Sequence, residues 1–280
     1  MLTRSALART CADVEIWPDV ECHSASDIRT AGSGCPWTEP LGKVHAPGTL
    51  KKSIYGAERP EDIPAYSFQE AAGLVGLPRS TLRSWVQGRS FPRRDGVGRS
   101  QAIIPLRKGA GSFLSFTNVV EAHVLALMRR RYDLKLDVIR SGVRYVRDTL
   151  KVAHPLATER FKTNGVDLFV ERLGKLITAS KEGQLGMKDV LETSLERVEY
   201  DREGRAVRLF PLFRRSDAPR HIVIDPRRAF GRPVLVGTSV PVVDIRSRFD
   251  AGESVDELAT DYDVKREMIE EALRAAPQAA

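Results

Sequence analysis

Hydrophobic positions first recur at a regular interval just after residue 65. Their spacing predicts a helix whose apolar face consists of Phe68, Ala71, Ala72 and Val75. Ser67 stands before this segment and Glu70 follows three residues later, which is the arrangement of a capping box at a helix start. Gly76-Leu77-Pro78 then predicts a break and the start of a second helix. The inward stripe of that helix is Leu82, Trp85 and Val86, and Gly88 ends it.

The period changes between residues 91 and 116. Glycines flank two β-prone runs, Ala102 to Leu106 and Ser112 to Phe116, which predict a hairpin with a basic tip. Two long segments of helical periodicity follow, about Thr117 to Arg131 and Leu136 to Leu150. Their inward positions are Val120, Val124, Leu127 and Met128 in the first helix, and Val138, Ile139, Val143, Val146 and Leu150 in the second.

The middle of the chain, about residues 152–215, has a mixed pattern that predicts an α+β connecting region. Asn164-Gly165 within Phe161 to Glu171 is a hairpin-turn signal. Two runs predict strands, Leu176 to Ala179 and Ala206 to Phe213, with a helix from Lys188 to Val198 between them. We expect this region to join the two ends of the chain or to pair subunits.

The last segment begins with a strand predicted over His221 to Asp225. A glycine- and proline-rich turn follows at Gly231 to Val240, and three short helices are expected over Val242 to Ala251, Val255 to Tyr262 and Lys265 to Ala275. Ser254 and Glu257 form a second capping-box pattern. The whole pattern predicts an α+β, mainly helical protein, with a helix-turn-helix and hairpin unit over 64–151 and a three-helix domain over 216–276.

Residues 1–60 have no sustained periodicity and are broken by many prolines and glycines. They predict either a disordered tail or an over-called start codon, with the working protein beginning nearer Val44 or Ile54. All three cysteines, Cys11, Cys22 and Cys35, lie here, in a spacing that fits neither a zinc site nor a disulfide framework. Without a signal peptide or a long apolar run, we expect a cytoplasmic protein that needs no metal or other cofactor.

Charge is distributed unevenly along this chain of net charge +7. Residues 79–108 contain one acid, Asp95, against eight basic residues: Arg79, Arg83, Arg89, Arg93, Arg94, Arg99, Arg107 and Lys108. Residues 250–280 contain nine acids against three basic residues. The first distribution favours a nucleic acid as partner, and the second favours a protein surface because these acids would repel DNA.

The second predicted helix carries the side chains that DNA recognition requires. Arg79, Ser80 and Arg83 lie on the face opposite the apolar stripe. An arginine can bind guanine with two hydrogen bonds, and a serine can reach a base or a phosphate. The predicted DNA-binding set also includes residues that would neutralise the backbone, Arg93, Arg94, Arg99, Arg107 and Lys108.

Two segments resemble known families. Residues 66–68 with Ala71-Ala72, then residues 76–85, 116–121 and 136–140, resemble the winged helix-turn-helix of MerR-type regulators over about 85 residues. The long dimerising helix and the cysteine metal sensor of metal-responsive members are absent. Residues 231–242 (GRPVLVGTSVPV), with Gly252-Glu253-Ser254 and residues 258–262, resemble a small antitoxin-associated domain long catalogued as of unknown function.

Together the two segments resemble VapB-type antitoxins, whose partners are PIN-domain ribonuclease toxins. The resemblance implies a protein that represses its own operon and neutralises a toxin encoded beside it. A homodimer is expected because helix-turn-helix proteins usually read paired half-sites. Gly231 and Gly237 allow backbone conformations that are barred to other residues, and Pro233 stiffens the path. These residues, with Thr238 and Ser239, therefore either support the three helices or contact the toxin directly. Many members carry arginine where this chain has Ser239, so the role of that arginine does not carry over.

Three other functions are weighed against this one. An orphan MerR-like regulator would bind double-stranded operator DNA without a toxin, and a scaffold protein would use both helical ends for protein contacts. An enzyme is not expected, because the five histidines share no spacing with a nucleophile and no phosphate loop or zinc-protease motif occurs. His123 falls inside a predicted helix, where packing is a commoner role than catalysis.

Overall fold

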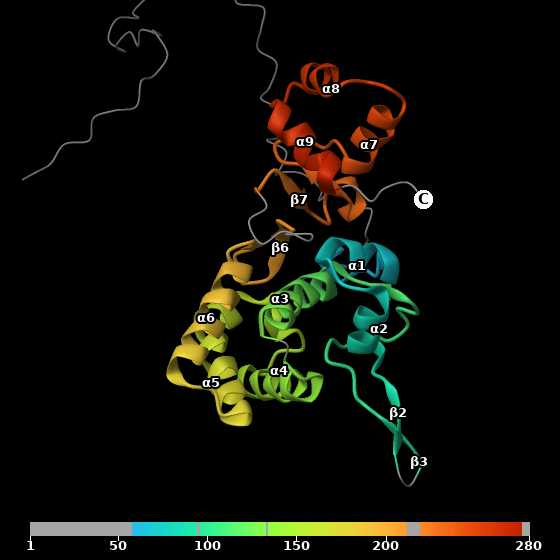
Figure 1. Cartoon of the computed structure of the whole chain (residues 1–280). Helices are drawn as coiled ribbons and strands as arrows, with labels where there is room; N and C mark the ends of the chain where they lie inside the picture. The colour runs from blue at the N-terminus through green and yellow to red at the C-terminus, as the bar shows by residue number, and fades with distance from the viewer. Residues whose placement is uncertain (1–57, 94–95, 133, 212–218, 276–280) are drawn as a thin grey trace, which may run out of the picture. The chain divides into compact units, whose positions relative to one another are not determined.

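The computed structural model describes residues 58–93, 96–132, 134–211 and 219–275. Most of the arm predicted over residues 1–60 therefore lies outside the described residues, as do all three cysteines. The fold is α+β, as the sequence predicted (Figure 1). The helices are α1 (Phe68–Val75), α2 (Arg79–Gln87), α3 (Phe116–Tyr132), α4 (Leu136–Leu150), α5 (Val166–Ile177), α6 (Lys181–Leu195), α7 (Val242–Asp250), α8 (Val255–Asp261) and α9 (Arg266–Ala275).

The strands are short and antiparallel. They are β1 (Tyr66–Ser67), β2 (Ser90–Arg93), β3 (Gly96–Arg99), β4 (Phe113–Leu114), β5 (Val198–Tyr200), β6 (Ala206–Leu209), β7 (Ile222–Ile224) and β8 (Pro233–Leu235). β1 pairs with β4, β2 pairs with β3, and the remaining four form one sheet in the order β5-β6-β7-β8.

Local sequence signals determine where α1 and α2 begin and end. Ser67 and Glu70 form the predicted capping box at the start of α1. Gly76 ends α1 in the left-handed conformation, with φ of 65°. Pro78 is the N-cap of α2, and Gly88 is its C-cap. The predicted inward stripe of α2 is confirmed, because Leu82, Trp85 and Val86 are all buried.

The hairpin predicted from Ala102–Leu106 and Ser112–Phe116 is wrong. The observed hairpin lies earlier and consists of β2 and β3, with Ser90 opposite Arg99. Ile103 and Ile104 are instead buried, and both of their amides donate to the Trp85 carbonyl near the end of α2. The second run contains β4, which pairs with β1. The apolar run from 102 to 106 therefore covers α2 rather than pairing with a strand.

Helix α3 is the centre of the larger core. It agrees with the prediction to within a residue at each end, and α4 matches its predicted range. Of the predicted inward residues of α3, Leu127 is half-buried and the other three are buried. Helices α1 and α6 pack against α3, and its polar residues Asn118, Glu121 and His123 are also buried.

Two predictions in the middle region are wrong. Asn164-Gly165 does not form a hairpin turn, because Phe161–Gly165 is a π-helical turn that leads directly into α5. Leu176 to Ala179 is not a strand, because α5 continues to Ile177. The helix predicted from Lys188 is α6, which begins seven residues earlier, and the strand predicted from Ala206 is the shorter β6.

The C-terminal helices and β7 agree well with the prediction, but the turn predicted over Gly231 to Val240 contains a strand, β8, which pairs with β7. Strand β7 and helices α7, α8 and α9 lie within a residue of their predicted limits, and Ser254 and Glu257 form the second capping box. The three helices enclose a core of their own, which includes Ile245, Leu258 and Ile269. Ile224 of β7 contributes to the larger core instead, because β7 pairs with β6.

Candidate nucleic-acid interface

Helix α2 presents a polar face at its N-terminal end. Arg79, Ser80 and Arg83 are exposed, whereas Leu82 and Trp85 on the other side have no exposed surface. The Arg83 Nε donates to the Gln87 Oε1 at 2.9 Å, so this guanidinium lies along the helix without an acid partner among the described residues. The helix therefore carries hydrogen-bond donors on a surface that no other described element covers.

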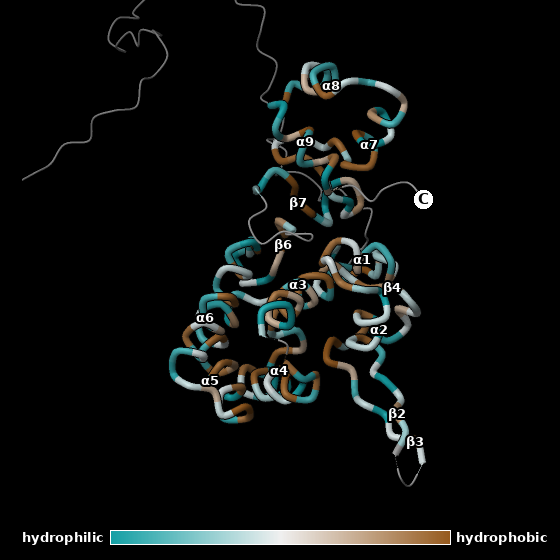
Figure 2. Tube along the Cα trace, viewed as in Figure 1, coloured by the Kyte–Doolittle hydropathy of each residue, from teal (hydrophilic) through white to brown (hydrophobic). Residues whose placement is uncertain are grey.

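The β2–β3 hairpin follows α2 directly and projects beyond it (Figure 1). Gly88 makes this junction tight: its φ is 77°, and a Cβ there would lie 2.1 Å from the Ser100 carbonyl oxygen. The Ser100 amide donates to the Arg89 carbonyl at 2.8 Å, and the Arg99 Nη2 donates to the Gln87 carbonyl at 3.4 Å. Figure 2 shows hydrophilic and intermediate colours along the hairpin, and Val97 is 80% exposed.

The predicted basic residues do not all have the same surroundings. Arg89, Arg99 and Lys108 are exposed. Arg107 is also exposed but forms an ion pair with Glu58, with Nη2 and Oε1 2.7 Å apart. The hydrogen bond and charge of Arg107 lower the pKa of Glu58 below its usual value. Only the backbone of Arg93 is described, in β2, and Arg94 lies outside the described residues.

Three arginines of α4 border this surface and were missed by sequence reasoning. The Arg140 Nε donates to the Gln101 carbonyl at 2.9 Å, and the Arg144 Nη2 donates to the Gln101 Oε1 at 2.6 Å. The Arg147 Nη2 donates to the Ile103 carbonyl at 3.1 Å. They hold the segment that returns from the hairpin against α4. The partners lie 39 to 44 positions apart in sequence, so no local pattern could have revealed these contacts.

The C-terminal motif residues lie around β8. Gly231 is buried, and its carbonyl accepts a hydrogen bond from the Tyr66 hydroxyl at 2.9 Å. Pro233 begins β8, and Gly237 has φ of 81° in the turn that follows. The Thr238 Oγ1 donates to the Leu235 carbonyl and accepts from the Val240 amide. Ser239 is exposed and can meet a partner, whereas Gly231 and Thr238 have structural contacts.

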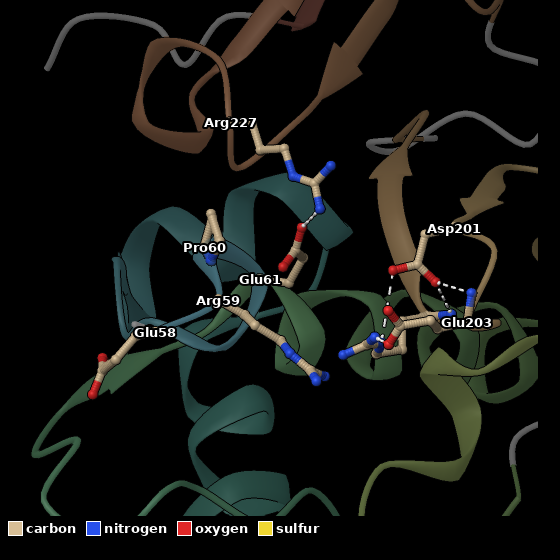
Figure 3. A pocket seen from close by; sticks show the side chains of 8 residues that line it. Glu58, Arg59, Pro60, Glu61, Asp201, Glu203 and Arg227 are labelled. Atoms are coloured by element: carbon tan, nitrogen blue, oxygen red, sulfur yellow. Dashed lines mark hydrogen bonds and ion pairs between the residues drawn. The ribbon is translucent and has the colours of Figure 1, made fainter. Parts of the chain in front are cut away.

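An open pocket of about 480 Å³ lies between the segment Glu58–Glu61, the β5–β6 turn and Arg227 (Figure 3). On one side the Arg227 Nη2 lies 2.8 Å from the Glu61 Oε1. On the other side Arg205 contacts Asp201 and Glu203. Because these charges largely neutralise one another, the pocket has no single sign of charge that would select an ionic ligand.

One buried titratable pair lies in the helical core. Glu121 of α3 is buried, and one of its carboxylate oxygens lies 2.9 Å from the Nδ1 of His154.

No cluster of three or more histidine, cysteine or acidic residues that could hold a metal ion is found within the described ranges. Within the same ranges, every helix is too short or too polar to cross a membrane.

Comparisons with known proteins identify relatives of the C-terminal domain and of most of the chain. Residues 222–275 match the family described as "Protein of unknown function (DUF433)". The chain is 29% identical over 230 residues to a Mycobacterium tuberculosis protein named "Putative antitoxin VapB45", and the match covers 76% of this chain and 94% of that protein. It is 28% identical over 221 residues to the uncharacterized protein Rv2308 of the same organism, covering 76% of this chain and 90% of that protein.

One solved structure shares the fold. The crystal structure of Rv2018 from Mycobacterium tuberculosis aligns with a TM-score of 0.57 and 22% identity, over 76% of this chain and 98% of that one. At this identity the likeness concerns the fold only.

Proposed function

We propose that this protein is the antitoxin of a type II toxin–antitoxin pair. It binds operator DNA as a homodimer through a MerR-like winged helix-turn-helix, made of α1, α2 and the β2–β3 hairpin, and so regulates its own operon in the cytoplasm. Its C-terminal domain neutralises a PIN-domain ribonuclease toxin. The name of the VapB45 relative supports the antitoxin role, and the exposed side chains of α2 support DNA binding.

One observation carries the DNA-binding part of the proposal. Arg79, Ser80 and Arg83 are exposed on one face of α2 while the opposite face is fully buried, so the helix is anchored and its donors face solvent. A helix of this kind fits the major groove, and the hairpin at its C-terminal end supplies Arg99 for the adjacent backbone. Operator sites with twofold symmetry are expected, since a dimer reads paired half-sites.

Substitution of the two helix arginines tests this assignment. Arg79→Ala and Arg83→Ala are each expected to weaken binding to the operator by about 1–3 kcal/mol, because each removes a bidentate contact to a base. Gel-shift titrations at a fixed salt concentration measure the change. Arg202→Ala, which removes an exposed charge from the β5–β6 turn, is the matched control and leaves the affinity nearly unchanged. Unaltered affinity in both helix variants contradicts the assignment.

The toxin partner requires a separate experiment. The full chain and the protein encoded by the adjacent reading frame are co-expressed from one plasmid, and the mass of the purified product is measured. The expected product is a complex in which the ribonuclease activity of the second protein is suppressed. Two proteins that purify apart, with the ribonuclease fully active, would leave an orphan regulator as the better description.

The structure also determines which variants suit this experiment. Removing residues 216–280 would remove β7, whose Ile224 lies in the larger core and pairs opposite Leu209 of β6. Such a truncation would therefore disturb the DNA-binding part as well. Single substitutions on the surface of the C-terminal domain separate the two functions more cleanly.

A further inference from the structure

The turn between β7 and β8 presents an aromatic side chain to solvent. Phe230 is 74% exposed, the largest exposed fraction among the aromatic residues that the structure describes. Ala229 and Phe230 have φ of 45° and 54°, a region that residues other than glycine rarely adopt. Exposure of the apolar ring to water costs free energy, and so does the strained backbone that carries it. Backbone strain of this kind is characteristic of functional sites.

The strained conformation is fixed by hydrogen bonds. The Gly231 amide donates to the Arg228 carbonyl at 2.8 Å, and the Arg232 amide donates to the Ala229 carbonyl at 3.1 Å. Before the turn, Asp225 is buried and its Oδ1 accepts from the Arg227 amide at 2.9 Å. After Phe230, the Gly231 carbonyl is held by the Tyr66 hydroxyl. Phe230 is thus presented on a rigid support, which lowers the entropy lost when it binds.

Arg228 and Arg232 lie two residues before and two residues after Phe230 in the sequence. The Arg228 side chain is 46% exposed and forms a long ion pair with Asp225, in which Nε and Oδ2 are 3.9 Å apart, a separation too long for a hydrogen bond. Arg232 is exposed, and its side chain has no ion-pair partner among the described residues. Arg227 differs, because it is paired with Glu61. The turn therefore carries one exposed aromatic ring and, close to it in sequence, two exposed arginines, and aromatic and arginine side chains are the types enriched in protein interfaces.

We infer that the turn formed by residues 228–232 is the anchor by which this chain docks onto its protein partner. The partner surface that fits it is an apolar pocket for a phenyl ring with carboxylates at its rim. The inference rests on the proposed function and names the site that the toxin occupies. A protein is favoured over a nucleic acid because the positive charge is confined to two side chains, and the same domain carries the acids of residues 250–275, which repel a polyanion.

Phe230→Gly is the decisive variant. Glycine adopts a positive φ without strain, so the melting temperature of the free chain is expected to stay the same or rise. Affinity for the purified product of the adjacent reading frame is expected to fall by about tenfold or more, as measured by calorimetry, because an anchoring ring is lost. The double variant Arg228→Gln, Arg232→Gln is expected to weaken binding by about threefold to tenfold and to reduce its salt dependence.

Controls separate this inference from its alternatives. Val243→Ala removes another exposed apolar side chain of the same domain, from α7, and is expected to leave the affinity unchanged. If the wild-type pair does not form, toxin neutralisation itself is wrong. If the pair forms and Phe230→Gly binds as tightly as the wild type, only the docking site is wrong. A loss of operator binding or of self-association in Phe230→Gly, with toxin binding intact, would also overturn the inference.

Discussion

Two histidines on or against α3 have pKa values shifted in opposite directions. His123 is completely buried, and burial, with a further effect of the Arg130 and Arg197 charges, lowers its pKa to about 3. Burial also acts to lower the pKa of His154, but the hydrogen bond and charge of Glu121 outweigh it, so that the pKa of His154 is raised. His123 therefore stays neutral in the folded protein at pH values where it is protonated in the unfolded chain.

This difference predicts an acid-sensitive core. The folded pKa of His123 lies below its unfolded value near 6.5, so the unfolded state binds the extra proton between pH 3 and 6.5 and stability falls as the pH falls. Acidification from pH 7 to pH 5 is expected to cost about 2 kcal/mol through His123. Urea unfolding at both pH values measures this loss in the wild type and in His123→Gln.

Comparing the wild type with His123→Gln separates the effect of His123 on stability from that of the His154–Glu121 pair. The His154–Glu121 pair contributes with the opposite sign, since its stabilisation is present below pH 6.5 and is lost as the pH rises through the raised pKa. That contribution is common to both proteins and cancels in the difference. His123→Gln is expected to lose about 2 kcal/mol less than the wild type on acidification. An equal loss in both would show that His123 is not the group responsible.

At the residue scale, the sequence predicted the roles of those side chains whose interaction partners are close in the chain. Ser67 and Ser254 were assigned as helix caps because each cap bonds to a residue three positions away. The assignment of His123 as a packed residue came from its place within a helix. Arg107 was grouped with the DNA-binding residues because its partner Glu58 is 49 positions away, and no local rule relates the two.

Helices and their ends were predicted better than strands. The sequences of α4 and of the C-terminal helices have strong helical periodicity, and these segments are helical in the folded chain. The strands have two to four residues each, which is too few to show an alternating pattern. The β2–β3 hairpin was missed because Ser90–Arg93 includes Pro92, a residue that weakens a strand prediction, and because the apolar residues Ile103 and Ile104 looked more strand-like.

The π-helical turn at Phe161–Gly165 shows how tertiary packing overrides a turn signal. Asn-Gly is typical of a hairpin turn, but here Gly165 provides space. A Cβ at this position would lie 2.5 Å from the Phe161 ring, and that ring packs edge-on against Phe169 with centroids 5.9 Å apart. The glycine is needed for close packing in the helical core, because the Phe161 ring, four residues earlier, is fixed by its contact with Phe169 and leaves no room for a side chain.

At the scale of the whole molecule, the contacts between the N-terminal helices and the C-terminal segment could not be predicted. Tyr66 and Gly231 are 165 residues apart, yet the hydroxyl of one binds the carbonyl of the other in a buried site. Tyr66 lies in β1, directly before the capping box of α1, and Gly231 ends the turn that presents Phe230. This hydrogen bond is therefore a physical connection between the proposed DNA-binding helices and the proposed docking site.

A double-mutant cycle tests the connection. Gly231→Ala places a methyl group 2.2 Å from the Tyr66 hydroxyl oxygen at a φ of 78°, so it is expected to destabilise the protein by about 2 kcal/mol or more. Tyr66→Phe leaves the Gly231 carbonyl without its donor and is expected to cost about 1–2 kcal/mol. Because phenylalanine lacks the oxygen that the methyl group meets, the double variant is expected to lose at least about 0.5 kcal/mol less than the sum. Urea unfolding of the four proteins measures these values, and strict additivity would show that the two positions do not touch in solution.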